Sequence, residues 1–339
     1  MTATTLLSTA HALTASGKGI LAADESFPTI EKRFKVLGIP STEENRRAYR
    51  ELLFATPGLG EFISGVILFD ETIRQKTGGA SMPETLARIG IIPGVKVDGG
   101  TMALPGFAGE KITQGLDGLR EKLAAYREQG ARFTKWRAVI GLGERLPTAT
   151  CIEANARALA LFAALSQEAG LVPIVEPEVL MDGDHSLARC EEVTRMTLES
   201  VFGALFEHRV ALEHMLLKTG MVLPGKECRQ QAEVGEIAEA TLRCLRRGVP
   251  AAVPGIVFLS GGQSDVAATE RLNAICAGGG APWTLTFSFG RALQDAALKI
   301  WKGSPANVAA AQAALLHRAK CNALAVQGKY SADVESATV

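Results

Sequence analysis

The chain has 339 residues, 47% of them hydrophobic, and its 36 basic side chains are matched by 36 acidic ones. This length suits one large α/β domain, and the balanced charge does not favour nucleic acid as a partner. The sequence contains neither a basic, apolar-cored leader nor a run approaching the ~18 apolar residues of a membrane helix, so we expect a cytoplasmic protein with no membrane partner.

Eight short apolar or β-rich segments recur along the chain, with helical patterns between them. They cover residues 19–23, 62–69, 91–97, 132–140, 171–178, 215–218, 255–259 and 284–289. Strands that alternate with helical crossovers pair in parallel, and a closed barrel is the commonest arrangement of eight of them. The sequence therefore predicts a single α/β barrel domain over residues 1–339, with extra helices at both ends. An open, doubly wound sheet is the alternative.

Two of the intervening helices have N-terminal signals. One is predicted to open at Ser41-Thr-Glu-Glu44. For another, Thr150 and Glu153 have the spacing of a capping box, and apolar residues follow at helical spacing until Gly170. The polar segment from Ser331 to Val339 is expected to be a mobile tail.

The cysteines and histidines do not indicate a metal site. The six cysteines lie far apart without a C-x-x-C pair, which indicates reduced thiols. His208 and His214 are expected to share a helix, but they are six residues apart, which does not aim two imidazoles at one ion.

Polar side chains occur toward the C-terminal ends of most predicted strands. In a barrel these ends surround one mouth, whereas an open sheet would spread them apart, so they favour the barrel and one shared pocket. Asp70 is interpreted as a helix N-cap outside the site. The set is Asp24, Asp70, Lys96, Lys135, Glu176, Lys218, Ser260 and Arg291.

Lys218 stands out among the three lysines of this set. Lys96 has Asp98 two residues away on the same strand face, and Lys135 has Arg137 in that relation, but Lys218 has no such charged neighbour. Lysine is rarely buried without a partner, and an amine that is desolvated near other cations becomes nucleophilic. Lys218 is therefore predicted to form a Schiff base, the alternative for each lysine being a solvated or salt-bridged residue.

The loops after the last two predicted strands have the composition of a phosphate site. Barrel enzymes often bind phosphate there, through backbone N–H groups and a helix N-terminus. Ser260-Gly-Gly-Gln263 allows close backbone approach, and Gly290-Arg291 adds an arginine fork. Lys32 and Arg33 are candidates for a second phosphate, the alternative being a solvated helix face.

Seven motifs, in order from about Gly17 to Tyr330, resemble those of class I fructose-1,6-bisphosphate aldolases. They are LAADES at 21–26, VKVD at 95–98, KWR at 135–137, VEPE at 175–178, LLK at 216–218, FLSGGQ at 258–263 and FSFGRALQ at 287–294. The resemblance implies a (β/α)8 TIM barrel, usually a homotetramer, that acts as a lyase on sugar phosphates in glycolysis and gluconeogenesis. It also implies that no metal or other cofactor takes part.

Carried over position by position, the resemblance gives each candidate residue a role. Lys218 is the Schiff-base lysine, Glu176 the acid/base for its formation, Asp24 the base at the C4 hydroxyl and Lys135 an electrostatic partner. The resemblance assigns Ser260, Gly261, Gly290 and Arg291 to one phosphate. The contacts toward the other end of the substrate are Ser26, Thr29, Arg33, Lys96 and Arg137.

The residues themselves support the same chemistry. Cleavage of a carbon–carbon bond beside a ketone leaves a carbanion, and an iminium on Lys218 accepts that charge far better than a carbonyl does. Glu176, surrounded by lysines, is expected to stay ionised until a proton is delivered, and Asp24 to take the hydroxyl proton. Glu178, on the same strand face as Glu176, is expected to be a structural partner of a lysine.

The predicted function is thus reversible cleavage of fructose 1,6-bisphosphate to dihydroxyacetone phosphate and glyceraldehyde 3-phosphate. One alternative is another Schiff-base sugar-phosphate aldolase, which should lack the second phosphate site near Arg33. The other is a non-catalytic aldolase-like scaffold, which should have a decayed site.

Three departures from the family pattern, at 27–29, Gly99 and 219–220, remove no catalytic group. Many relatives end in a tyrosine that assists proton exchange, whereas this sequence ends in Val339, so either another group does this or the step is slower.

Overall fold

The computed structural model describes residues 3–336 and confirms the predicted barrel. Eight parallel strands close in the order β1-β12-β11-β10-β9-β8-β5-β2, and each overlaps one of the predicted segments. Because β1 pairs with both β12 and β2, the sheet has no free edge and the open-sheet alternative is wrong. The strands are β1 (Gly19–Ala23), β2 (Ile63–Leu68), β5 (Ile92–Lys96), β8 (Phe133–Ile140), β9 (Val172–Val179), β10 (Leu216–Thr219), β11 (Gly255–Phe258) and β12 (Thr284–Phe289).

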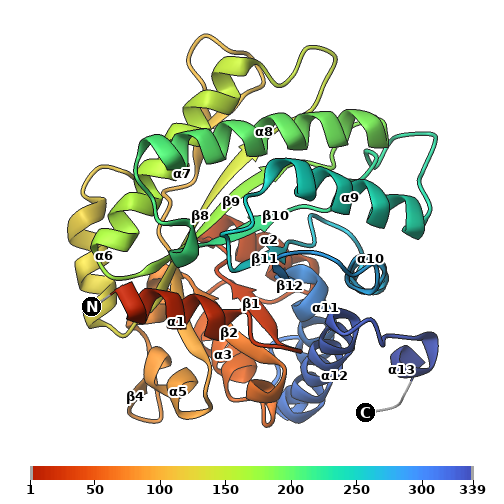
Figure 1. Ribbon diagram of the computed structural model, residues 1–339. Helices are drawn as coiled ribbons and strands as arrows, with labels where there is room; N and C mark the ends of the chain where they lie inside the picture. Colours follow the sequence, from red (N-terminus) through yellow and green to blue (C-terminus); the bar gives the residue numbers. More distant parts are fainter. Residues whose placement is uncertain (1–2, 337–339) are drawn as a thin grey trace.

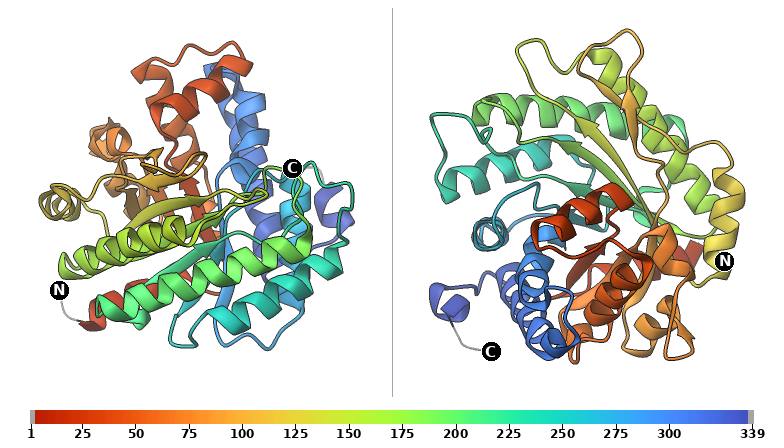
Figure 2. Two further views of the ribbon diagram at one scale, coloured as in Figure 1. Left: turned by 90° about the horizontal axis from the view of Figure 1, so that it is seen from above. Right: turned by 180° about the vertical axis from the view of Figure 1, so that it is seen from behind.

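Helices surround the barrel, and α7, α8 and α9 lie side by side along one flank (Figures 1 and 2). No helix within residues 3–336 is both long enough and apolar enough to cross a membrane. The helices are α1 (Ala3–Leu13), α2 (Phe27–Val36), α3 (Glu43–Phe54), α4 (Asp70–Arg74), α5 (Met82–Arg88), α6 (Leu119–Glu128), α7 (Ala149–Glu168), α8 (Leu187–Glu207), α9 (Val234–Gly248), α10 (Asp265–Ala277), α11 (Arg291–Trp301), α12 (Val308–Val326) and α13 (Ala332–Ser336), with 3-10 turns at Leu59–Glu61, Leu212–His214 and Pro305–Asn307.

The predicted N-terminal helix, α1, closes the end of the barrel at which the strands begin. Leu6 and Leu13 on α1 are buried in a cluster with Phe133, Leu216 and other side chains that fill the barrel interior. A side chain at Gly65 of β2 would place its Cβ 2.6 Å from Leu13 Cδ2, so the glycine leaves room for the Leu13 side chain as it is placed. The open, polar end of the barrel is therefore the opposite one.

Two short hairpins were not predicted. The pairs β3 (Lys76–Thr77) with β4 (Ala80–Ser81), and β6 (Thr101–Ala103) with β7 (Lys111–Thr113), are antiparallel. Strands of two or three residues are too short to have a periodic pattern. The second hairpin rests on β8, where the Thr113 hydroxyl donates to the backbone oxygen of Arg137 at 2.8 Å.

One predicted helix start is correct and the other is wrong. Thr42 caps α3 within the predicted 41–44 signal, but the N-cap of α7 is Thr148 rather than Thr150. The Thr148 hydroxyl accepts a hydrogen bond from the Cys151 backbone at 3.2 Å and donates to Glu110 at 2.6 Å. Because Glu110 is far away in the sequence, the local pattern could not identify this cap.

The structure also corrects two placements outside the barrel strands. His208 is the C-cap of α8, whereas His214 lies in the following 3-10 turn, so they do not share a helix. Asp70 is the first residue of α4 rather than its N-cap, which is Phe69. Its carboxylate accepts hydrogen bonds from Tyr126 and Arg74, each at 2.6 Å.

Part of the predicted tail is described. Ala332–Ser336 form α13, and Glu335 pairs with the buried Arg318 and accepts from the Tyr330 hydroxyl at 2.5 Å. Residues 337–339 lie outside the described range. The mobility of the tail stays a prediction.

Candidate active site

The C-terminal ends of the barrel strands surround one cavity of about 790 Å³. Every residue to which the family resemblance assigned a role lines this cavity, from segments spread over most of the chain. These residues are Asp24, Ser26, Thr29, Arg33, Lys96, Lys135, Arg137, Glu176, Lys218, Ser260, Gly261, Gly290 and Arg291.

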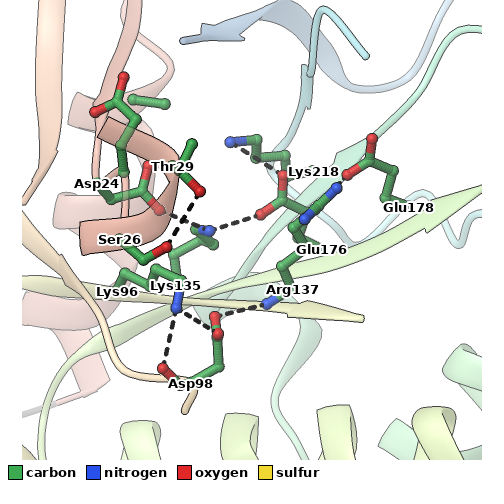
Figure 3. Close-up of polar contacts among 12 residues, drawn as sticks. Asp24, Ser26, Thr29, Lys96, Asp98, Lys135, Arg137, Glu176, Glu178 and Lys218 are labelled. Atoms are coloured by element: carbon green, nitrogen blue, oxygen red, sulfur yellow. Dashed lines mark hydrogen bonds and ion pairs between the residues drawn. The ribbon is translucent and has the colours of Figure 1, made fainter. Parts of the chain in front are cut away.

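Four charged side chains of alternating sign form a row in the wall of the cavity (Figure 3). Lys135 Nζ lies 2.7 Å from Asp24 Oδ2 and 3.1 Å from Glu176 Oε2. Lys218 Nζ lies 3.1 Å from the other oxygen of Glu176. The members come from β1, β8, β9 and β10, so only barrel closure brings them together.

Lys135 and Glu176 lie within their strands, and both strands continue toward the solvent beyond them. The row is consequently deep, and the side chains of Lys135, Glu176 and Lys218 are each only 4% exposed. Lys218 thus has an ionic partner after all, supplied by the neighbouring strand and not by its own. Burial makes these contacts much stronger than those of a surface ion pair.

The row controls the charge of its own members. Burial alone would raise the pKa of Asp24, but Lys135 and Lys218 outweigh it and lower the pKa to about 2. Burial is likewise outweighed at Glu176, where Lys135 and Lys218 hold the pKa below its ordinary value. Burial would lower the pKa of Lys135, but Asp24 and Glu176 raise it above its ordinary value. Both carboxylates are therefore anionic near neutral pH, as predicted for Glu176, and Lys135 is a cation.

Glu176 retains room for a proton. Its Oε2 atom is buried and, although it faces Lys135, accepts no hydrogen bond of good geometry from residues 3–336. A buried carboxylate oxygen without a hydrogen bond is uncommon and suits a group that exchanges a proton. Glu176 can therefore act on the amine that its other oxygen touches.

Two further pairs lie nearer the rim. Lys96 Nζ lies 2.5 Å from Asp98 Oδ1, so the two residues pair, although β5 ends at Lys96 and Asp98 lies in the following loop rather than on the strand. Glu178 pairs with Arg137, so the prediction of a lysine partner is wrong. Arg137 reaches Glu178 from the adjacent strand β8, which pairs with β9 along its whole length.

Arg33 is not on a solvated helix face. Its side chain is only 10% exposed and is held by Glu25 and, at 2.9 Å, by Asp295. Glu25 also binds the buried Arg50 at 2.6 Å. Lys32, in contrast, is exposed and does not line the cavity.

Sequence reasoning missed Glu25 and Ser288 as cavity residues, and it was wrong to place Asp70 outside the site, because Asp70 also lines the cavity. Glu25 lies beside Asp24 in the LAADES motif, and Ser288 lies in the FSFGRALQ motif, so motif membership was the available signal. The Ser288 hydroxyl oxygen is buried without a hydrogen-bond partner among residues 3–336. Such a hydroxyl is free to bind a ligand in the cavity.

The loops after β11 and β12 form a candidate anion site. Gly261 and Gly262 have φ values of +58° and +95°, which glycine adopts without strain, and within the described residues their N–H groups have no acceptor. Gly290 precedes the N-terminus of α11, where further N–H groups are free. Arg291, the first residue of α11, is exposed and has no ion pair with any carboxylate of residues 3–336.

A second candidate anion site lies at the N-terminus of α2. Ser26 and Thr29 place their hydroxyl oxygens 3.1 Å apart, and Ser26 does not cap the helix with its side chain. Lys96 and Arg137 follow from β5 and β8. In the barrel order β5 lies opposite β11, and β8 opposite β12, so these two cations face the first anion site across the mouth.

Residues 5–339 match the family model described as fructose-bisphosphate aldolase class I. A probable fructose-bisphosphate aldolase class 1 of Xanthomonas campestris pathovar campestris is 58% identical over 327 residues, covering 96% of this chain and 98% of that protein. A cytosolic fructose-bisphosphate aldolase of Arabidopsis thaliana is 50% identical over 332 residues, covering 97% of this chain and 84% of that protein.

A solved structure agrees with these relatives. The fructose-bisphosphate aldolase of Plasmodium falciparum, in complex with TRAP and a small-molecule inhibitor, superimposes with a TM-score of 0.95. It is 50% identical, and the alignment covers 97% of this chain and 95% of that one.

Proposed function

This chain belongs to the class I fructose-bisphosphate aldolase family, and on that premise we propose that Lys218 forms the Schiff base through which it cleaves fructose 1,6-bisphosphate. The products are dihydroxyacetone phosphate and glyceraldehyde 3-phosphate, and the reaction is reversible. The observation that carries the proposal is the buried contact of 3.1 Å between Lys218 and Glu176.

Lys218 is the best nucleophile of the three cavity lysines because it makes the fewest polar contacts. It touches one carboxylate oxygen, whereas Lys135 lies between two carboxylates that raise its pKa. Lys96 binds both the side chain and the backbone oxygen of Asp98. A lysine must lose its proton before it can attack a carbonyl, so the lysine with the fewest oxygen acceptors around its amine is favoured.

Schiff-base formation follows from the position of Glu176. The amine of Lys218 adds to the C2 carbonyl of the ketose and gives a carbinolamine. Glu176 holds the proton that it took from the Lys218 ammonium group before the attack, and it gives this proton to the C2 hydroxyl, which leaves as water. The nitrogen keeps its remaining hydrogen and becomes the iminium. The Oε1 oxygen of Glu176 lies 3.1 Å from Lys218 Nζ, which supports this shuttle.

Bond cleavage then needs a base at C4, and we assign it to Asp24. Its carboxylate is ionised near neutral pH, lies in the same row and lines the cavity. As Asp24 removes the C4 hydroxyl proton, the C3–C4 bond breaks and its electrons move to the iminium, which becomes an enamine. Protonation at C3 and hydrolysis release dihydroxyacetone phosphate and regenerate Lys218. Lys135 stabilises the two carboxylates throughout.

The two anion sites support a bisphosphate as substrate. One phosphate would bind at Ser260, Gly261, Gly290 and Arg291, and the other near Ser26, Thr29, Arg33, Lys96 and Arg137, with the row of catalytic groups between them. A Schiff-base aldolase for singly phosphorylated sugars would not need the second site. A scaffold protein would not need the intact row of buried charges.

We further propose a cytoplasmic homotetramer in which residues 1–339 act as one domain. The family resemblance and the cytosolic relative of Arabidopsis thaliana support this assignment. Light scattering coupled to size-exclusion chromatography would measure the mass of the assembly, and a mass of one or two chains would contradict it.

Trapping tests the central proposal directly. The protein would be incubated with dihydroxyacetone phosphate, reduced with borohydride and digested, and mass spectrometry would locate the added three-carbon phosphate. We expect it on Lys218, and an adduct on Lys135 or Lys96 would reject the assigned nucleophile.

A further inference from the structure

Lys226 lies at the rim of the first anion site, although no motif singles it out. It belongs to the loop between β10 and α9, and its ammonium group reaches Gly262. A side chain at Gly262 would place its Cβ 3.0 Å from Lys226 Nζ and 3.2 Å from Arg291 Nη2. The two cations therefore converge on the same side of the glycine loop.

The charges at this point are not balanced. Lys226 Nζ lies 3.0 Å from Asp182, but Arg291 has no carboxylate partner among residues 3–336. Only one of the two cations thus has a carboxylate partner within residues 3–336, and both lie next to Gly261 and Gly262, whose N–H groups have no acceptor in that range. Like charges held together with free donors are stabilised by an anion placed between them.

The backbone that carries Lys226 is fixed to the neighbouring loop. The N–H group of Lys226 donates to the backbone oxygen of Met181, and that of Glu227 to the oxygen of Gly183, both at 2.9 Å. At Gly225 a Cβ would lie 2.1 Å from the Gly183 oxygen, so the two loops approach too closely for any other residue. Only the side chain of Lys226 is free to change partner.

We infer that Lys226 is a second cation of the first phosphate site and that it moves from Asp182 to the substrate phosphate on binding. The inference rests on the proposed role of Arg291 in the same site. Asp182 then acts as a counter-ion that holds Lys226 when no phosphate is present. The contact is electrostatic, with no bond made or broken, so Lys226 affects substrate binding more than turnover.

Two substitutions with opposite expected signs test this inference. Lys226→Met should raise KM for fructose 1,6-bisphosphate, and Ki for inorganic phosphate as a competitive inhibitor, by roughly three- to tenfold. Asp182→Asn removes the competing carboxylate and should lower Ki for phosphate by about twofold. Lys226→Arg should stay close to the unaltered protein. Arg243→Met is the matched control, because it breaks another ion pair of a similarly exposed cation, between Arg243 of α9 and Glu191 of α8.

The directions in which Lys226→Met and Asp182→Asn change phosphate binding separate a binding role of Lys226 from a structural one. If Lys226→Met and Asp182→Asn both weaken phosphate binding, or both leave it unchanged, the pair only joins two loops and the inference is wrong. Arg291→Ala in the same assay shows whether the inference about Lys226 fails alone or the proposed phosphate site fails with it. A large effect of Arg291→Ala with none of Lys226→Met rejects Lys226 alone, whereas no effect of either rejects the proposed phosphate site as well.

Discussion

Glu176 and Lys218 hold their charged atoms 3.1 Å apart deep in the cavity of the barrel, with only 4% of each side chain exposed. They come from neighbouring strands, β9 and β10, and the same Glu176 carboxylate also faces Lys135 at 3.1 Å. One carboxylate therefore connects a lysine that is held as a cation to a lysine that has fewer contacts. This geometry distinguishes the two amines, and the distinction can be tested.

Lys218→Met should abolish borohydride trapping with dihydroxyacetone phosphate and leave the fold intact, because methionine matches the lysine stem and suits an apolar strand. Lys135→Met should still trap, more slowly, since it removes a charge from the row but not the nucleophile. The trapped fraction is measured by intact mass, and circular dichroism checks the fold. Trapping by Lys218→Met at the unaltered rate would contradict the assignment.

Arg291→Ala should impair phosphorylated substrates much more than a non-phosphorylated analogue. A charged hydrogen bond to phosphate contributes roughly 1.5–3 kcal/mol, or about 10- to 150-fold in kcat/KM. Steady-state kinetics on both substrates provide the comparison. Equal losses would show that Arg291 does not bind phosphate.

Chelation by EDTA should leave activity unchanged, because an iminium replaces the Lewis acid that a metal-dependent aldolase needs. Among residues 3–336, no three His, Cys, Asp or Glu side chains are grouped to hold an ion. Activity is assayed after dialysis against EDTA, and again after zinc is added. Loss on chelation with recovery on zinc would overturn the class I chemistry.

Asp24 should make stability depend on acid pH. Its pKa is about 2 in the folded protein and 3.8 as the ordinary value, so its stabilising effect is present above pH 3.8 and is lost as the pH falls toward 2. A shift of this size corresponds to roughly 2 kcal/mol. The free energy of unfolding from urea titrations should therefore differ between the unaltered protein and Asp24→Asn at pH 6, and much less at pH 2.5. A difference that stays constant with pH would rule out this cause.

Leu13→Ala should destabilise the barrel without altering the chemistry. Leu13 is fully buried under the strands, and removing such a side chain costs about 2–5 kcal/mol. Leu7 on the same helix is 36% exposed, so Leu7→Ala is the matched control and should cost much less. Urea unfolding measures the loss of stability in both variants. Equal losses would contradict the conclusion that α1 closes the barrel by burying Leu13.

Much of the fold was predictable because its signals are local. The eight strands are short apolar runs, and the start of α3 is marked by Thr42 directly before its first helical residue. The start of α7 was not predictable from residues 150–153, because Thr148 is held by the distant Glu110. The strands of the β3–β4 and β6–β7 hairpins are too short to show a periodic pattern of apolar residues.

The same division applies to the site. The sequence by itself determined which chemical groups are available, since a lysine after an apolar run and a glycine pair before a helix are properties of neighbouring residues. Only the tertiary structure decided how these groups pair. Lys218 meets Glu176, and Glu178 meets Arg137 instead of a lysine, because strand register and barrel closure set the distances between them. Electrostatic energy depends on those distances and on burial, and neither is a property of a linear segment.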